Sequence, residues 1–121
     1  MENIYKEIVL DHYKYPRNYG LIQKPDSRAK EENIFCGDSV EISLKFDGKK
    51  IKDIKFKGKG CVISQAAASI LTDYIKGKPL KKAGKMTTED LLKLLGIALS
   101  PTRMKCAELP LITLKKALKL P

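Results

Sequence analysis

Three cysteines place the strongest constraint on the fold of this chain. They are its only cysteines, at positions 36, 61 and 106, so 24 and 44 residues separate them. A local zinc knuckle has ligands only a few residues apart, so a site that uses all three thiols has to be assembled by the tertiary fold. Asp38 follows Cys36 by two residues and is the candidate fourth ligand. The alternative is three unconnected, inert cysteines in the core.

The length of 121 residues predicts a single domain over 1–121, and a hydrophobic content of 43% is enough for one core. No segment approaches eighteen uninterrupted apolar residues, and the amino terminus lacks the pattern of a signal peptide. We therefore expect a cytoplasmic protein without a membrane partner. An odd number of cysteines is typical of a reducing compartment, where thiols stay free for metal or sulfur chemistry.

The formal net charge is +10, from 24 Lys and Arg against 14 Asp and Glu. Such a charge attracts phosphate, so a basic nucleic-acid-binding module with structural zinc is one alternative function. The lysines are spread along the whole sequence, which favours a solvated surface, or a docking face for an acidic protein, over a nucleic-acid groove. Zinc-finger spacing and aromatic-basic runs are also missing. Nucleic acid is therefore not the expected partner.

Hydrophobic periodicity predicts one helix and three strands in the first half of the chain. The helix begins near residue 4 and ends before Pro16. It carries the only histidine, His12, on its apolar side, where packing or docking is expected and metal binding is not. Alternation predicts a β hairpin over 40–56, with its turn at Asp47-Gly48, and an edge strand over 28–35.

Three further helices are predicted in the second half. The first starts near Cys61 and Ser64 and ends at Gly77, so Cys61 lies where unpaired amides favour an anion such as a thiolate. The second is capped by Thr87 or Thr88 and ends before Gly96. The last begins at Ser100-Pro101 and carries Cys106 in its second turn. Pro110 predicts a kink or break there, because it lacks the amide that would bond to the Cys106 carbonyl.

The residue types around the cysteines favour a site that takes up and releases its metal. A carboxylate is a harder and more exchangeable ligand than a thiolate for zinc or iron, so Asp38 weakens the set. Gly37 and Gly60 permit backbone conformations that bring the sulfurs near one ion. Lys59 and Lys105 are expected to lower the pKa of the neighbouring thiols through their charge.

Four motifs, which together cover nearly the whole chain, resemble the iron-sulfur cluster scaffold family of IscU, SufU and the amino-terminal domain of NifU. They are Asp11-His12-Tyr13 with Pro16-Arg17-Asn18; Cys36-Gly37-Asp38; Gly60-Cys61 with Ser64 and the small residues 66–69; and Arg103-x-Lys105-Cys106. Ordered motifs at family-like spacing are far more specific than any one alone.

The resemblance implies an α+β fold, with a small three-stranded antiparallel sheet packed against about four helices. It implies that Cys36, Asp38, Cys61 and Cys106 hold a transient [2Fe-2S] cluster, with Zn²⁺ or Fe²⁺ as alternatives in the same site. The implied partners are a cysteine desulfurase, apoproteins that receive the cluster, and an iron donor. The protein is then a scaffold or carrier more than an enzyme, with Cys106 as the candidate sulfur acceptor.

The chain departs from both branches of that family. The stretch 99–105 lacks the Leu-Pro-Pro-Val-Lys motif and the histidine of IscU, so a dedicated Hsp70 chaperone is not expected. Lys105 resembles SufU, whose members are zinc-dependent sulfurtransferases, but the long SufU insertion before the third cysteine is missing. The alternative function is therefore a SufU-like sulfurtransferase that activates a desulfurase.

Overall fold

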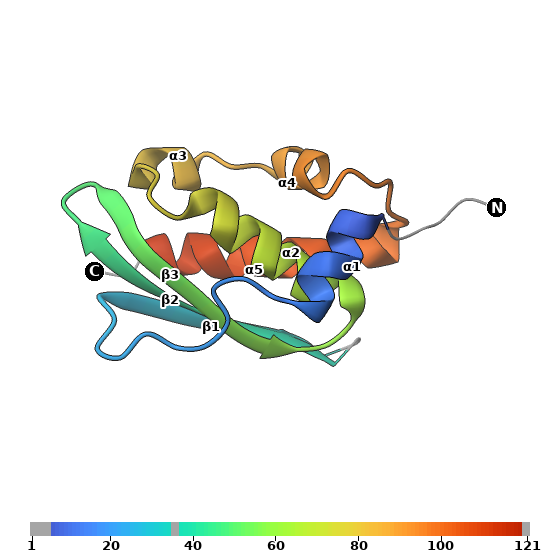
Figure 1. Ribbon diagram of the computed structural model, residues 1–121, viewed down its shortest axis with the longest axis horizontal. Coiled ribbons are helices and arrows are strands. Elements are labelled where there is room, and N and C mark those ends of the chain that lie inside the picture. The colour runs from blue at the N-terminus through green and yellow to red at the C-terminus, as the bar shows by residue number, and fades with distance from the viewer. Residues whose placement is uncertain (1–5, 35–36, 120–121) are drawn as a thin grey trace.

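Helices cover one face of a three-stranded antiparallel sheet (Figure 1). The computed structural model describes residues 6–34 and 37–119. The elements run in the order α1 (Glu7–Lys14), β1 (Ser27–Asn33), β2 (Asp38–Asp47), β3 (Lys50–Lys59), α2 (Val62–Ile75), α3 (Leu80–Gly84), α4 (Thr88–Leu95) and α5 (Pro101–Lys119). α2 and α5 pack on the sheet, and α3 and α4 lie beyond these two helices. The predicted α+β fold is confirmed.

The sheet has the strand order β1-β2-β3, with Ile42 of β2 opposite Ala29 and Phe56. Alternate side chains of β2 point to the helices and are fully buried; these are Val40, Ile42 and Leu44. The predicted hairpin and edge strand are therefore confirmed. The outer edge of β3 is covered, because the amide of Gly20 donates to the Phe56 carbonyl (2.7 Å) and the Phe56 amide donates to the Asn18 carbonyl (2.9 Å).

The two long helices form the centre of the molecule. α2 buries a run of small residues, 66–69, which lets α1 and α5 approach it closely. A kink or a break was predicted at Pro110; α5 continues through this residue, so there is no break. Pro110 is buried together with Leu109 and Leu111, and this packing keeps the helix continuous although one backbone hydrogen bond is missing.

Of the two shorter helices in the second half of the chain, α4 was predicted from its capping residues and α3 was not. α4 has the predicted capping box between Thr87 and Asp90, and it ends at Gly96 with a φ of 71°. α3 was not predicted, and it follows Pro79, whose neighbours are hydrogen-bonded to the hairpin. Among the described residues no helix is long and apolar enough to cross a membrane.

His12 fastens α1 to α2, as its position on the apolar side of α1 predicted. It is 7% exposed, its Nδ1 lies 2.7 Å from Ser69 Oγ, and the same hydroxyl accepts a hydrogen bond from the Arg17 amide (2.8 Å). Burial lowers the pKa of His12 below its usual 6.5, and the Arg17 charge adds to this effect, while Asp11 and Asp73 oppose it.

This burial predicts a pH dependence of stability. Because the pKa is lowered in the folded state, the unfolded chain takes up the proton first as the pH falls. The free energy of unfolding should therefore keep its full value above about pH 6.5 and decline below it. Urea unfolding of the parent and of His12→Gln between about pH 7.5 and 5.5 isolates the contribution of His12. If the two proteins lose stability in parallel, His12 does not cause the decline.

Candidate metal centre

Three separate elements deliver candidate ligands to one end of the molecule. Asp38 is the first residue of β2, Cys61 is the N-cap of α2, and Cys106 lies in the second turn of α5. The beginnings of β2, α2 and α5 lie together at the end where β3 finishes (Figure 1). The fold therefore brings together residues that are far apart in sequence. Cys36, the fourth predicted ligand, lies outside the described residues.

The ligand atoms of Asp38, Cys61 and Cys106 all lie within 4.8 Å of one another. Asp38 Oδ2 is 3.8 Å from Cys61 Sγ, and Asp38 Oδ1 accepts a hydrogen bond from the Cys61 amide (2.9 Å). A tetrahedral zinc ion needs sulfur and oxygen ligands about 3.5–3.8 Å apart. Small movements of these side chains would thus produce the spacing that a metal requires, and two thiols with a carboxylate suit zinc or iron.

Cys61 also caps the helix that carries it. Its Sγ accepts a hydrogen bond from the Ser64 amide (3.4 Å), and Ser64 Oγ donates to the Cys61 carbonyl (3.1 Å). The N-cap of α2 is therefore the cysteine, and Ser64 lies in the first turn of the helix. The sulfur is consequently held at the positive end of the α2 dipole, where a thiolate is stabilised.

Gly60 follows β3 directly and lies against Asp38, which leaves no room for a side chain at position 60. Its φ is 144°, and a Cβ placed there would lie 2.7 Å from Asp38 Cγ and 3.0 Å from Asp38 Cα. Real Cβ atoms essentially never show the first distance, and the second is tighter than nine in ten real Cβ contacts. A glycine is therefore needed at position 60, as predicted, because any side chain there would collide with Asp38. Gly37, with a φ of 73°, has no atom within 4 Å of such a Cβ.

The two described thiols have different surroundings. Cys61 is exposed, whereas Cys106 is only 5% exposed. Burial raises the pKa of the Cys106 thiol, and hydrogen bonding with Asp38 and Cys61 raises it further. The expectation that Lys105 lowers this pKa is wrong, because Lys105 faces solvent while Cys106 faces the core.

One contact of the site was not anticipated from the sequence. The Asp38 carboxylate does more than face the thiols, since it also holds the amide of Cys61. A residue with two such tasks cannot be recognised from spacing alone, because its partner is 23 residues away. The burial of Asp38, with 1% exposure, is the reason for this contact, since a buried carboxylate needs partners.

Comparison with known proteins agrees with the geometry. The family model of the NifU-like N terminal domain matches residues 4–120. The zinc-dependent sulfurtransferase SufU of Bacillus subtilis (strain 168) is 35% identical over an alignment of 134 residues, which covers 96% of this chain and 90% of the relative. The iron-sulfur cluster assembly scaffold protein IscU of Aquifex aeolicus (strain VF5) is 37% identical over 117 residues, covering 95% and 74%.

A solved structure shares the fold. The crystal structure of FiSufU, from the thermophile Fervidobacterium islandicum AW-1, superposes with a TM-score of 0.80 and 32% identity, covering 96% of this chain and 97% of that one. The family match, the sequence identity and the superposition each extend over almost the whole chain. This chain belongs to the NifU-like N-terminal domain family.

Proposed function

We propose that this protein is an iron-sulfur cluster assembly scaffold, which receives sulfur from a cysteine desulfurase and passes a labile [2Fe-2S] cluster to apoproteins. The observation that carries the proposal is the meeting of Asp38, Cys61 and Cys106 within 4.8 Å in a chain of this family. Relatives named as IscU scaffolds support it. Cys36 is the proposed fourth ligand, and the whole chain, 1–121, is proposed as one cytoplasmic domain that also meets an iron donor.

Sulfur transfer to the scaffold is a thiol exchange. A scaffold thiolate attacks the terminal sulfur of the desulfurase persulfide, the S–S bond breaks, and the desulfurase cysteine leaves as a thiolate. Two electrons from a thiol reductant then convert the transferred sulfur to the sulfide of the cluster. Cys106, the acceptor favoured by sequence, is 5% exposed, so its acceptance of sulfur requires the start of α5 to move. Cys61 is exposed and needs no such movement.

Anaerobic reconstitution tests the proposal. The protein is incubated with iron, cysteine, a thiol reductant and a desulfurase, and visible absorption follows cluster formation. An apo-ferredoxin is then added. The scaffold function predicts a coloured cluster that moves to the ferredoxin. Tightly held zinc that iron does not replace would contradict it.

Asp38→Asn is expected to give a cluster that forms but is transferred at least about 10-fold more slowly, because the exchangeable carboxylate is lost. Alanine would also remove the acceptor of the Cys61 amide, a loss worth about 1–3 kcal/mol, whereas asparagine keeps it. The measurement is the transfer rate to apo-ferredoxin. Asp47→Asn, an exposed change in the hairpin turn, is the control. Equal rates for Asp38→Asn and the parent would remove the assigned role of Asp38.

A second function, a zinc-dependent sulfurtransferase, is favoured by the 35% identity to the Bacillus relative of that name. In this mechanism Cys36, Asp38 and Cys61 would retain zinc, and the ion would hold their side chains in place. Cys106 would take the sulfur. The alignment to that relative spans 134 positions, more than the 121 residues of this chain, so the relative has residues that this chain lacks. The alignment to the Aquifex scaffold spans 117 positions. Desulfurase stimulation that persists in Cys106→Ser would argue against this mechanism.

A further inference from the structure

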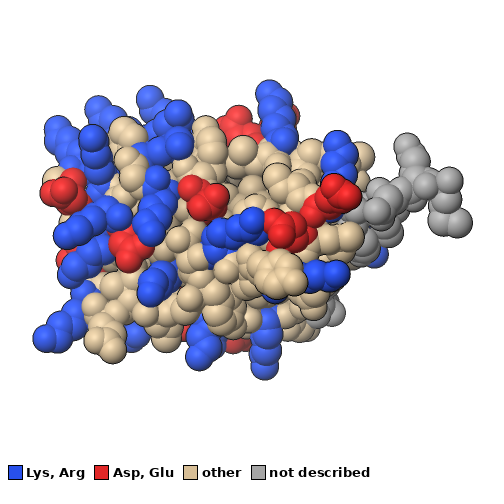
Figure 2. Space-filling model, viewed as in Figure 1, with Lys and Arg blue, Asp and Glu red and all other residues tan. Residues whose placement is uncertain are grey.

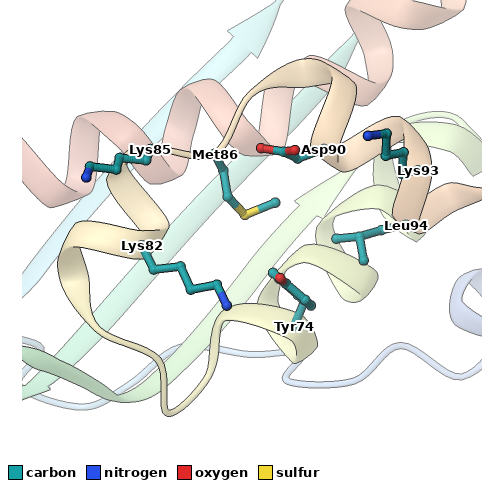
Figure 3. Close-up of a pocket in the computed structure, with 7 residues that line it drawn as sticks. All are labelled: Tyr74, Lys82, Lys85, Met86, Asp90, Lys93 and Leu94. Carbon is teal, nitrogen blue, oxygen red and sulfur yellow. The ribbon is translucent and has the colours of Figure 1, made fainter.

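A groove lies between α2, α3 and α4, away from the metal centre. Its volume is about 390 Å³. Tyr74, Met86 and Leu94 form its apolar floor, and Lys82, Lys85 and Lys93 line its rim. Figure 3 shows the Met86 side chain pointing into the middle of the groove and the Lys82 nitrogen beside Tyr74, while the Lys85 side chain extends away from Met86.

The rim carries an excess of positive charge. Within residues 6–34 and 37–119, Lys82, Lys85 and Lys93 form no ion pair. The single acid among the lining residues is Asp90, and its Oδ2 already accepts the Thr87 amide of the capping box (3.0 Å). The groove is therefore lined by three lysines and one carboxylate, and that carboxylate already accepts a hydrogen bond.

The fold concentrates lysines that the sequence spreads out. The Ile51 amide donates to the Lys78 carbonyl (2.9 Å) and the Leu80 amide donates to the Lys49 carbonyl (2.8 Å), so the hairpin and the α2–α3 segment are joined. Basic side chains accordingly crowd the end of the molecule that holds α3 and the β2–β3 turn (Figure 2). The groove opens beside this region, which favours negatively charged ligands.

The size and floor of the groove favour a peptide. Its volume equals roughly a dozen waters at about 30 Å³ each, so an inorganic anion would leave it mostly filled with water. An apolar side chain against the half-buried Tyr74 and Leu94 would displace that water, while flanking carboxylates would meet the lysines. The partner that fits is a segment with one apolar side chain between acidic residues.

Tyr74 argues against nucleic acid. Lys78 Nζ lies 4.3 Å from the centroid of its ring, and Lys82 Nζ lies 5.9 Å from it. Single-stranded nucleic acid is usually bound by stacking bases on open aromatic rings. Here Lys78 Nζ lies over one face of the ring, and it would have to leave before a base could stack on that face.

We propose that the groove of Tyr74, Met86, Leu94 and the three rim lysines docks an acidic, apolar-anchored segment of a partner protein. Cys61 begins α2 and Tyr74 lies 13 residues later in the same helix, so the groove and the metal centre are about 20 Å apart. A partner can be held at the groove while the ligands stay accessible. The proposal does not rest on the scaffold function.

Fluorescence anisotropy with a fluorescein-labelled acidic peptide, containing one leucine between glutamates and aspartates, tests the proposal. The triple variant Lys82→Gln, Lys85→Gln, Lys93→Gln should bind it at least about tenfold more weakly than the parent. All three lysines are exposed, so the fold should be retained, which thermal unfolding checks. A peptide with serine in place of leucine should also bind more weakly. Zinc loading should leave the affinity unchanged.

The matched control removes three lysines elsewhere. Lys49→Gln, Lys52→Gln, Lys57→Gln changes exposed residues of the hairpin that do not line the groove. An equal loss of affinity in this control would overturn the proposal, because net charge alone would then explain the binding. Absence of peptide binding by the parent would also overturn it. So would a labelled oligothymidylate that binds as tightly as the peptide and loses affinity in the groove variant.

Discussion

Gly60→Ala is expected to lower the free energy of unfolding by about 2–6 kcal/mol and to weaken zinc binding. The added methyl would have to occupy the space of the Asp38 carboxyl, and the residue would keep a φ of 144° that alanine rarely adopts. Overpacking and backbone strain each cost about 1–3 kcal/mol. Urea unfolding measures the first effect, and competition with a chromophoric chelator measures the second.

Gly20→Ala separates the two causes. Gly20 has a similar φ of 130°, but the nearest atom to its Cβ is the flexible end of Lys55 at 3.9 Å. Only the strain should remain there, about 1–2 kcal/mol, with zinc binding unchanged. If Gly60→Ala and Gly20→Ala behaved alike, the collision with Asp38 would not matter to the metal centre.

Cys106→Ala should abolish cluster assembly and weaken zinc binding by more than about 100-fold, since loss of a direct ligand exceeds the effect of losing a ligand's support. The metal-free protein should change in stability by only about 1 kcal/mol, because the lost sulfur is small and buried. Chelator competition and urea unfolding of the metal-free protein measure these two quantities.

Two controls accompany this variant. Lys105→Gln changes the preceding, exposed residue and should leave zinc binding unchanged. Cys61→Ser removes the other described thiol but keeps a side chain able to accept the Ser64 amide, so α2 should keep its cap while zinc binding falls. Unchanged zinc binding in both cysteine variants would remove the metal centre from the proposed function.

Features set by neighbouring residues were predictable from the sequence. The hairpin turn needs a glycine at position 48, where φ is 61°, and the capping box needs Thr87 and Asp90 three residues apart. Both follow from local hydrogen bonding and backbone geometry. The convergence of Asp38, Cys61 and Cys106 was predicted for a different reason, because the motifs around them resemble a known family.

Features set by packing were not predictable in the same way. The proline at 110 was expected to kink or break α5, but burial of its neighbours keeps the helix continuous. Lys105 was expected to lower the pKa of the next thiol, but the helix turns about 100° from one residue to the next, which leaves Lys105 exposed and Cys106 buried. The lysine-rimmed groove depends on backbone bonds between the hairpin and residues 78–80, which no spacing in the sequence reveals.

The double role of Cys61 has a spectroscopic consequence. The same sulfur that faces Asp38 accepts the amide proton of Ser64. Any cation or cluster that withdraws electron density from this sulfur weakens it as an acceptor and alters the magnetic environment of that proton. The backbone resonance of Ser64 therefore reports the loading state of the site without an added label, and it does so from the first turn of the helix.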